Sequence, residues 1–199
     1  MHRIGYLLSD GFQIMTLASQ SVFEYANDTL GETFYGIENF SMAGGEVRSS
    51  LGMKVGTRAL SARTAMDTWI AAGVNTPLTT HPSDDLLAFV RRASTRSRRI
   101  AGICTGGFVL AEAGLLANRR ATMHWAFARD LQRLFPDVRV EEDRIYIVDG
   151  PVWTSGISAR TWRARSRTSS SCISGARAAS RSIRRCWISR RSRIASRTR

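Results

Sequence analysis

The stretch Arg99–Ala111 places one cysteine at a turn between two apolar segments, and this feature constrains the fold more than any other in the chain. An apolar run ends in small residues and resumes with helical spacing, which predicts a strand, a sharp turn and a helix. Gly102, Cys104 and Gly106 form a G-x-C-x-G pattern, the cysteine counterpart of the G-x-S-x-G nucleophile elbow. A strand that turns directly into a helix is typical of α/β proteins.

The position of Cys104 allows two interpretations. A thiol at a helix N-terminus faces unpaired backbone N–H groups and the positive end of the helix dipole, which favours the thiolate, lowers the pKa and makes Cys104 a candidate nucleophile. Alternatively, Cys104 is a buried free cysteine that only packs, because free cysteine is among the most buried residue types. The spacing alone does not choose between them.

Strands and helices are predicted to alternate along residues 3–155. The first strand, Arg3–Leu8, precedes a helix that ends near Gly31 and whose predicted buried face holds Ile14, Leu17, Ala18, Ser21, Val22, Tyr25 and Ala26. Further strands are predicted at 34–43, 68–73 and 152–155, an extended pair around Gly52, a hairpin from 138–140 and 144–148, and helices from Ser83 and over 126–135. This order predicts an α/β layered fold with a largely parallel sheet, whose sites lie beyond the carboxyl ends of the strands.

Three groups are predicted to lie near Cys104. The backbone N–H groups of Gly73 and Val74, after the 68–73 strand, would face the thiol across the sheet edge. His124 follows the elbow by 20 residues, enough for a helix and a returning strand, and would act as a base within about 3 Å of the thiol. The alternative for His124 is a histidine that caps the next helix or is satisfied in the core. His2 and His81 have no comparable context.

The net charge of +13 lies entirely in the C-terminal tail, because residues 1–159 hold equal numbers of acidic and basic residues and 160–199 hold 13 arginines and no acid. We therefore predict one domain over 1–159 and an Arg/Ser-rich tail over 160–199. No signal-peptide pattern and no apolar run near 18 residues is present, so a cytoplasmic protein without membrane contact is expected. Cys104 is the one cysteine before the tail, which argues against disulfides. No metal or cofactor is predicted.

Several segments together resemble the ThiJ/PfpI superfamily, the class I glutamine-amidotransferase-like proteins. The resemblance rests on 103–116 with 119–125, and on 11–19, 45–52 and 149–155, and it covers about 3–159. More narrowly, the chain resembles the N-terminal domain of AraC-type transcriptional regulators of the GlxA kind. The resemblance implies a flavodoxin-like three-layer α/β/α sandwich with a mostly parallel central sheet and a cysteine nucleophile elbow.

Two functions follow from the resemblance. As in the regulators, the domain would sense a small nitrogenous metabolite, such as an amino acid or betaine, at Thr16, Gly73, Val74, Cys104, Thr105 and Gly106. Such regulators bind DNA through a C-terminal helix-turn-helix domain, which we do not expect within this sequence, and superfamily members commonly form homodimers. The alternative is a cysteine-dependent hydrolase or hydratase, similar to isonitrile hydratase, that uses Cys104 and His124. Thr16 stands where hydratase-like relatives carry an aspartate, and a hydroxyl cannot replace a carboxylate base.

The family pattern is lost after Ser155, where the resemblance implies a long apolar helix packed on the sheet. We interpret the Arg/Ser-rich tail as the product of a frameshift that truncates a regulator, and sequencing the gene tests this. Loss of the helix would leave part of one sheet face uncovered, a surface that favours aggregation or partner binding. The other interpretation of the tail is a nucleic-acid-binding arm, because dense arginine supplies phosphate contacts.

Overall fold

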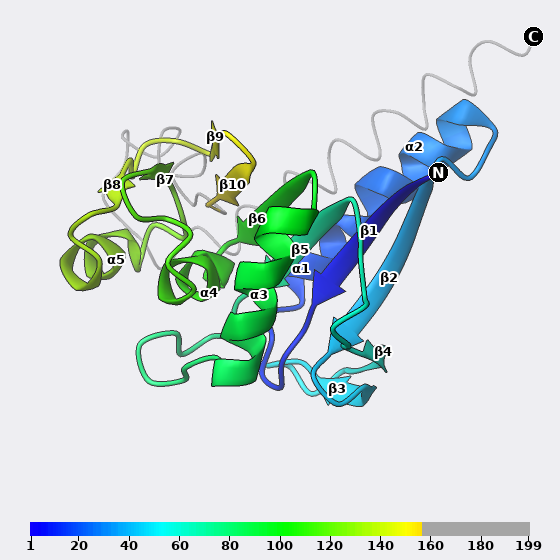
Figure 1. Cartoon of the computed structure of the whole chain (residues 1–199), viewed down its shortest axis with the longest axis horizontal. Helices are drawn as coiled ribbons and strands as arrows, with labels where there is room; N and C mark the ends of the chain where they lie inside the picture. The colour runs from blue at the N-terminus through cyan, green and yellow to red at the C-terminus, as the bar shows by residue number, and fades with distance from the viewer. Residues whose placement is uncertain (157–199) are drawn as a thin grey trace, which may run out of the picture. The chain divides into compact units, whose positions relative to one another are not determined.

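The structure, a computed structural model, describes residues 1–156 (Figure 1). Five helices lie in this part of the chain: α1 (Met15–Ala18), α2 (Gln20–Leu30), α3 (Asp84–Arg96), α4 (Gly106–Glu112) and α5 (Ala128–Leu134). The strands are β1 (His2–Leu7), β2 (Tyr35–Ser41), β3 (Gly45–Arg48), β4 (Lys54–Ala59), β5 (Thr68–Ala72), β6 (Arg99–Ile103), β7 (Arg120–Ala121), β8 (Arg139–Val140), β9 (Tyr146–Asp149) and β10 (Val152–Ser155).

Eight of these strands form one sheet in the order β3-β4-β2-β1-β5-β6-β10-β9. The pairs from β4 to β10 are parallel, whereas β3 pairs with β4 and β9 pairs with β10 in antiparallel fashion at the two edges. Because the parallel strands all end at the same edge, the turns after β1, β5 and β6 lie close together there. The sheet is therefore mostly parallel, as predicted.

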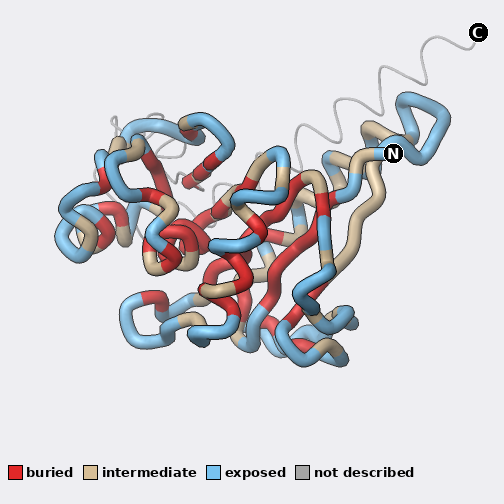
Figure 2. The backbone as a smooth tube through the Cα atoms, viewed as in Figure 1, coloured by how far each residue is buried: buried red, intermediate tan, exposed pale blue. Residues whose placement is uncertain are grey.

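Two separate apolar clusters show that helices cover both faces of the sheet. On one face, Trp69 and Ile100 pack with residues of α3 and α4 such as Val90 and Leu110. On the other face, Ile4, Tyr6 and Ile70 pack with Ile14, Leu17 and Phe23 from the α1–α2 segment. Figure 2 shows the buried residues concentrated in the central strands and in α3 and α4. This arrangement confirms the predicted flavodoxin-like α/β fold.

The predicted hairpin between 138–140 and 144–148 is wrong. β8 pairs instead with β7, in parallel, as a separate two-stranded sheet, and β9 turns back to pair with β10. The β9–β10 connection is a short turn at Gly150, whose φ of +59° lies in the left-handed region that glycine adopts easily. The two-residue connection between β9 and β10 brings its flanking strands together more readily than the five-residue segment 141–145 between β8 and β9 does.

The helix predicted to end near Gly31 is present as α1 and α2, which are separated at Ser19, and only Ile14 and Leu17 of its predicted buried face pack against the core. None of the residues of α2 is buried (Figure 2). Val22 and Tyr25 are 64% and 70% exposed. Polar contacts hold α2 to the adjacent strand: Asn27 bonds both backbone groups of Tyr35, and the Gln20 amide donates to Asn39 at 2.7 Å. The amphipathic pattern is present, but no described element packs against its outer part.

The expectations for the tail over 160–199, including the frameshift and the nucleic-acid-binding arm, lie outside the described residues. Within residues 1–156, no helix combines the length and apolar character that crossing a lipid bilayer requires.

Candidate functional site

The elbow predicted at Cys104 is present between β6 and α4. Cys104 has a φ of +57°, a left-handed conformation that non-glycine residues rarely adopt and that costs about 1–3 kcal/mol. Its N–H donates to the Ser155 carbonyl oxygen of β10 at 2.8 Å, which ties the turn to the next strand. A Cβ on Gly102 would lie 2.9 Å from backbone atoms of Gly106, so the flanking glycines permit the strand to enter the helix abruptly.

The elbow packs directly against the end of β5. A Cβ on Gly73 would overlap Thr105, and one on Gly106 would overlap the Ala71 carbonyl oxygen. The Thr105 hydroxyl donates to the Val74 carbonyl oxygen at 2.8 Å and lies 3.2 Å from Oε1 of Gln13, in the turn after β1. The structure thus brings Gly73, Val74, Thr105 and Gly106 together at one sheet edge.

The thiol of Cys104 is buried, with 2% of the residue exposed. Burial raises the pKa of this thiol above its ordinary value, and the hydrogen bond from the Thr105 backbone N–H lowers it by less. This corrects the predicted lower pKa: the helix N-terminus does favour the thiolate, but removing the charged form from water outweighs that effect. In this conformation the sulfur is predominantly a thiol at neutral pH.

His124 does not form the predicted hydrogen bond with Cys104 in the described structure. Its Nδ1 instead accepts the Ala126 backbone N–H at 3.2 Å, close to the start of α5. The ring stacks on Trp125, with centroids 5.7 Å apart, and packs against Phe127. Burial lowers the pKa of His124, which keeps the imidazole neutral near pH 7. The side chain does not cap α5, whose first turn receives no side-chain hydrogen bond from the described residues, so these contacts are closer to the alternative of a histidine satisfied by its packing.

A cavity of about 220 Å³ opens at the same sheet edge and contains part of the predicted site. Gly73, Val74 and Thr105 line it, whereas Thr16, Cys104 and Gly106 do not. Its other lining residues come from the loops after β1 and β5, the start of α3 and the first turns of α4: Ser9, Ala72, Thr80, His81, Pro82, Ser83, Leu86, Phe108 and Val109. The cavity therefore combines an apolar floor with hydroxyl and imidazole groups around it.

His81, which lines the cavity, and its contact partner Glu112 were not predicted from the sequence. The His81 Nδ1 lies 3.3 Å from the Glu112 carboxylate, whose side chain is only 17% exposed. His81 lines the cavity although its sequence context appeared uninformative. The available signal was its place in the loop after β5, because loops at the carboxyl ends of parallel strands carry the sites of such folds.

Thr16, predicted as a ligand-binding residue, is fully buried in α1. Its Oγ1 has no hydrogen-bond partner among the described residues. A buried hydroxyl without a partner is costly, and Thr16 does not line the cavity described above, so the structure does not bring it to the rest of the predicted ligand site. Among residues 1–156, no three His, Cys, Asp or Glu side chains are arranged to hold a metal ion.

The sequence is similar to a transcriptional regulator and, over a shorter segment, to an enzyme. The HTH-type transcriptional regulator GlxA of Rhizobium meliloti is 35% identical over 159 residues, which cover 78% of this chain and 48% of that protein. Isonitrile hydratase of Pseudomonas putida is 38% identical over only 73 residues, 37% of this chain and 31% of that enzyme. The chain spans about half the length of the regulator it matches.

A solved structure of an AraC family transcriptional regulator from Pseudomonas putida has the same fold, with a TM-score of 0.66 and 18% identity. The superposition covers 78% of this chain and 83% of that one. Residues 18–162 match the DJ-1/PfpI family, a range that includes the elbow and the β5 edge. With its mostly parallel sheet and Cys104 elbow, the chain belongs to the DJ-1/PfpI family.

Proposed function

We propose that this chain is the ligand-sensing domain of a transcriptional regulator and that the ligand is a small nitrogenous metabolite bound in the cavity at the β5–α4 edge. The similarity to regulators over most of the chain supports the regulatory role. DNA contacts, in this proposal, belong to a C-terminal domain outside this sequence, and the regulator is a homodimer.

The sensing role is supported by a cavity close to Cys104, whose thiol has a raised pKa and is therefore a poor nucleophile at neutral pH. The cavity of about 220 Å³ suits a molecule of amino-acid size, and Cys104 is buried with a raised pKa and no histidine partner among the described residues. The Glu112 carboxylate beside His81 supplies a negative charge near the cavity, which favours a ligand with an ammonium group.

Calorimetric titration of the full chain with a panel of amino acids and betaines tests the proposal. Thr80 is exposed and lines the cavity, so Thr80→Trp is expected to fill the cavity and abolish binding. Thr79, its exposed neighbour, does not line the cavity, so Thr79→Trp should bind like the wild type. Binding that survives Thr80→Trp, or a panel in which no compound binds, would contradict the proposed site.

A second function, a cysteine-dependent hydrolase or hydratase, is favoured by the strained backbone at Cys104. A φ of +57° at a cysteine is a cost that catalytic elbows carry to expose a nucleophile. In this alternative, His124 takes the thiol proton after a rearrangement that brings the two side chains into contact. Turnover of isonitriles that disappears in Cys104→Ala and in His124→Ala would establish it, and absence of turnover would leave the sensing role.

A further inference from the structure

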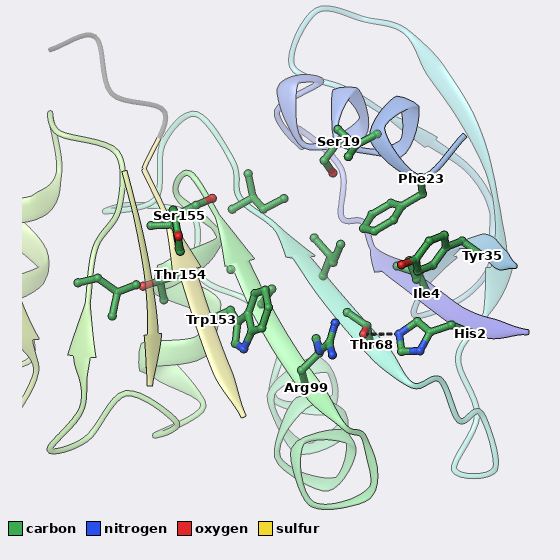
Figure 3. Close-up of a pocket in the computed structure, with 17 residues that line it drawn as sticks. His2, Ile4, Ser19, Phe23, Tyr35, Thr68, Arg99, Trp153, Thr154 and Ser155 are labelled. Atoms are coloured by element: carbon green, nitrogen blue, oxygen red, sulfur yellow. Dashed lines mark hydrogen bonds between the residues drawn. The ribbon is translucent and has the colours of Figure 1, made fainter. Parts of the chain in front are cut away.

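A second, larger cavity lies on the sheet face that α2 only partly covers, and Cys104 itself does not line it (Figure 3). Its volume is about 430 Å³, within the range of about 300–1,000 Å³ that is typical of small-molecule sites. Strands β1, β5, β6 and β10 form its floor, and α2 and β9 flank it. We refer to this cavity, with Ile70 at its centre and Arg99 at one end, as the sheet groove.

The walls of the sheet groove are apolar. Ile4, Ile70 and Ile103 come from three neighbouring parallel strands and point to the same face, because side chains two residues apart share a face. Phe23 of α2 closes one side, and Figure 3 shows it above the floor of the groove. From Arg99 to Ile103, β6 extends about 13 Å, which allows an extended aliphatic chain to lie along the strands.

One end of the sheet groove carries positive charge without a carboxylate partner. The Arg99 guanidinium lies 4.9 Å from the centre of the Trp153 ring and makes no ion pair with any residue of the described chain. In Figure 3 it lies between Trp153 and the hydrogen-bonded pair of His2 and Thr68. Asp67, just before β5, accepts the Arg3 backbone N–H at 2.8 Å instead.

We propose that the sheet groove binds an amphiphilic anion, a medium-chain carboxylate such as decanoate, with its head group on Arg99 and its chain along Ile70 and Ile103. The apolar walls remove the aliphatic chain of the ligand from water, and the Arg99 guanidinium can bind the carboxylate through two hydrogen bonds. Charge favours this occupant over residues 160–199, whose 13 arginines and no acids would be repelled by Arg99. This site is distinct from the cavity at the Cys104 edge.

Calorimetric titration of the full chain with decanoate, below its micelle concentration, tests the proposal. One saturating site is expected. Arg99→Gln should weaken decanoate about tenfold, since one charge-assisted hydrogen-bonded pair is lost. Arg92→Gln removes the same charge from exposed α3 on the opposite face and should leave the affinity unchanged. Decyltrimethylammonium, which has the same chain and a cationic head, should not compete.

A third variant tests whether the ligand lies in the groove itself. Ala101 is in the middle of β6 and lines the groove. Ala101→Trp should therefore prevent the aliphatic chain of decanoate from entering the groove, while circular dichroism shows an intact fold. Equal binding of decanoate by Arg99→Gln, or of the cationic amphiphile by the wild type, would overturn the proposal. Absence of decanoate binding would also overturn the proposal. If the protein is a dimer that Ala101→Trp dissociates and decanoate does not bind, the groove is assigned to a second copy of this protein.

Discussion

Replacing Thr16 by valine should stabilise the protein. Thr16 is fully buried, and its hydroxyl has no partner within the described chain, whereas its backbone N–H bonds the Gln13 carbonyl oxygen and is unaffected by the change. Valine has nearly the same shape, with a methyl group in place of the hydroxyl. Burial of an unpaired hydroxyl costs about 1–3 kcal/mol, so Thr16→Val should recover about 1 kcal/mol or more.

The assay is urea and thermal unfolding of the wild type and variant. A gain of about 1 kcal/mol raises the Tm of a domain of this size by about 2–4 °C. Thr154→Val is the matched control, because Thr154 is also buried but its Oγ1 accepts the Thr122 backbone N–H at 2.9 Å. That variant leaves a buried N–H unpaired and should lose about 1–3 kcal/mol. A loss in Thr16→Val as large as in Thr154→Val would refute the reasoning.

Three other predictions concern titration and close packing. Because burial raises the pKa of Cys104, its alkylation rate by iodoacetamide should still increase above pH of about 8.5, and a plateau below neutral pH would contradict this. Burial also raises the pKa of Tyr6 to about 12. The stability that its neutral phenol contributes is therefore complete below the ordinary pKa of about 10 and is lost as the pH rises through about 12. The difference in unfolding free energy between the wild type and Tyr6→Phe, measured across this pH range, tests this. Gly106→Ala should cost about 1–3 kcal/mol in urea unfolding, because the new methyl group overlaps the Ala71 carbonyl oxygen, while Gly56→Ala, with open space around it, should cost less.

The sequence predicted the features that local chemistry determines. The G-x-C-x-G pattern located the elbow, and the helix predicted to start from Ser83 is α3, where Ser83 is the N-cap and its Oγ accepts the Leu86 backbone N–H at 3.3 Å. Glycine spacing and capping act within a few residues, so no tertiary information is needed to see them. The alternation of strands and helices then indicated the parallel sheet.

Features that depend on distant segments were missed or predicted wrongly. β9 pairs with β10 rather than with β8. Which pairing forms depends on the relative stability of the connections before and after β9, and the alternation of apolar residues along the strands carries no information about this. The exposed face of α2 shows that an amphipathic pattern indicates a face but not what covers it. The His81–Glu112 contact joins residues 31 positions apart, and the pKa of Cys104 depends on a degree of burial that only the packed elbow creates.

The position of β9 has a consequence for the lifetime of the protein in concentrated solution. β9 is the last strand of the sheet, and its outer backbone groups have no strand partner among the described residues. Tyr146 is 67% exposed and Val148 44%, so an incoming strand would find both free hydrogen-bonding groups and apolar contacts there. Only four residues are available to pair, which makes each such encounter weak. Loss of protein through pairing at this edge would follow second-order kinetics, so dilution would slow it in proportion to the square of the concentration.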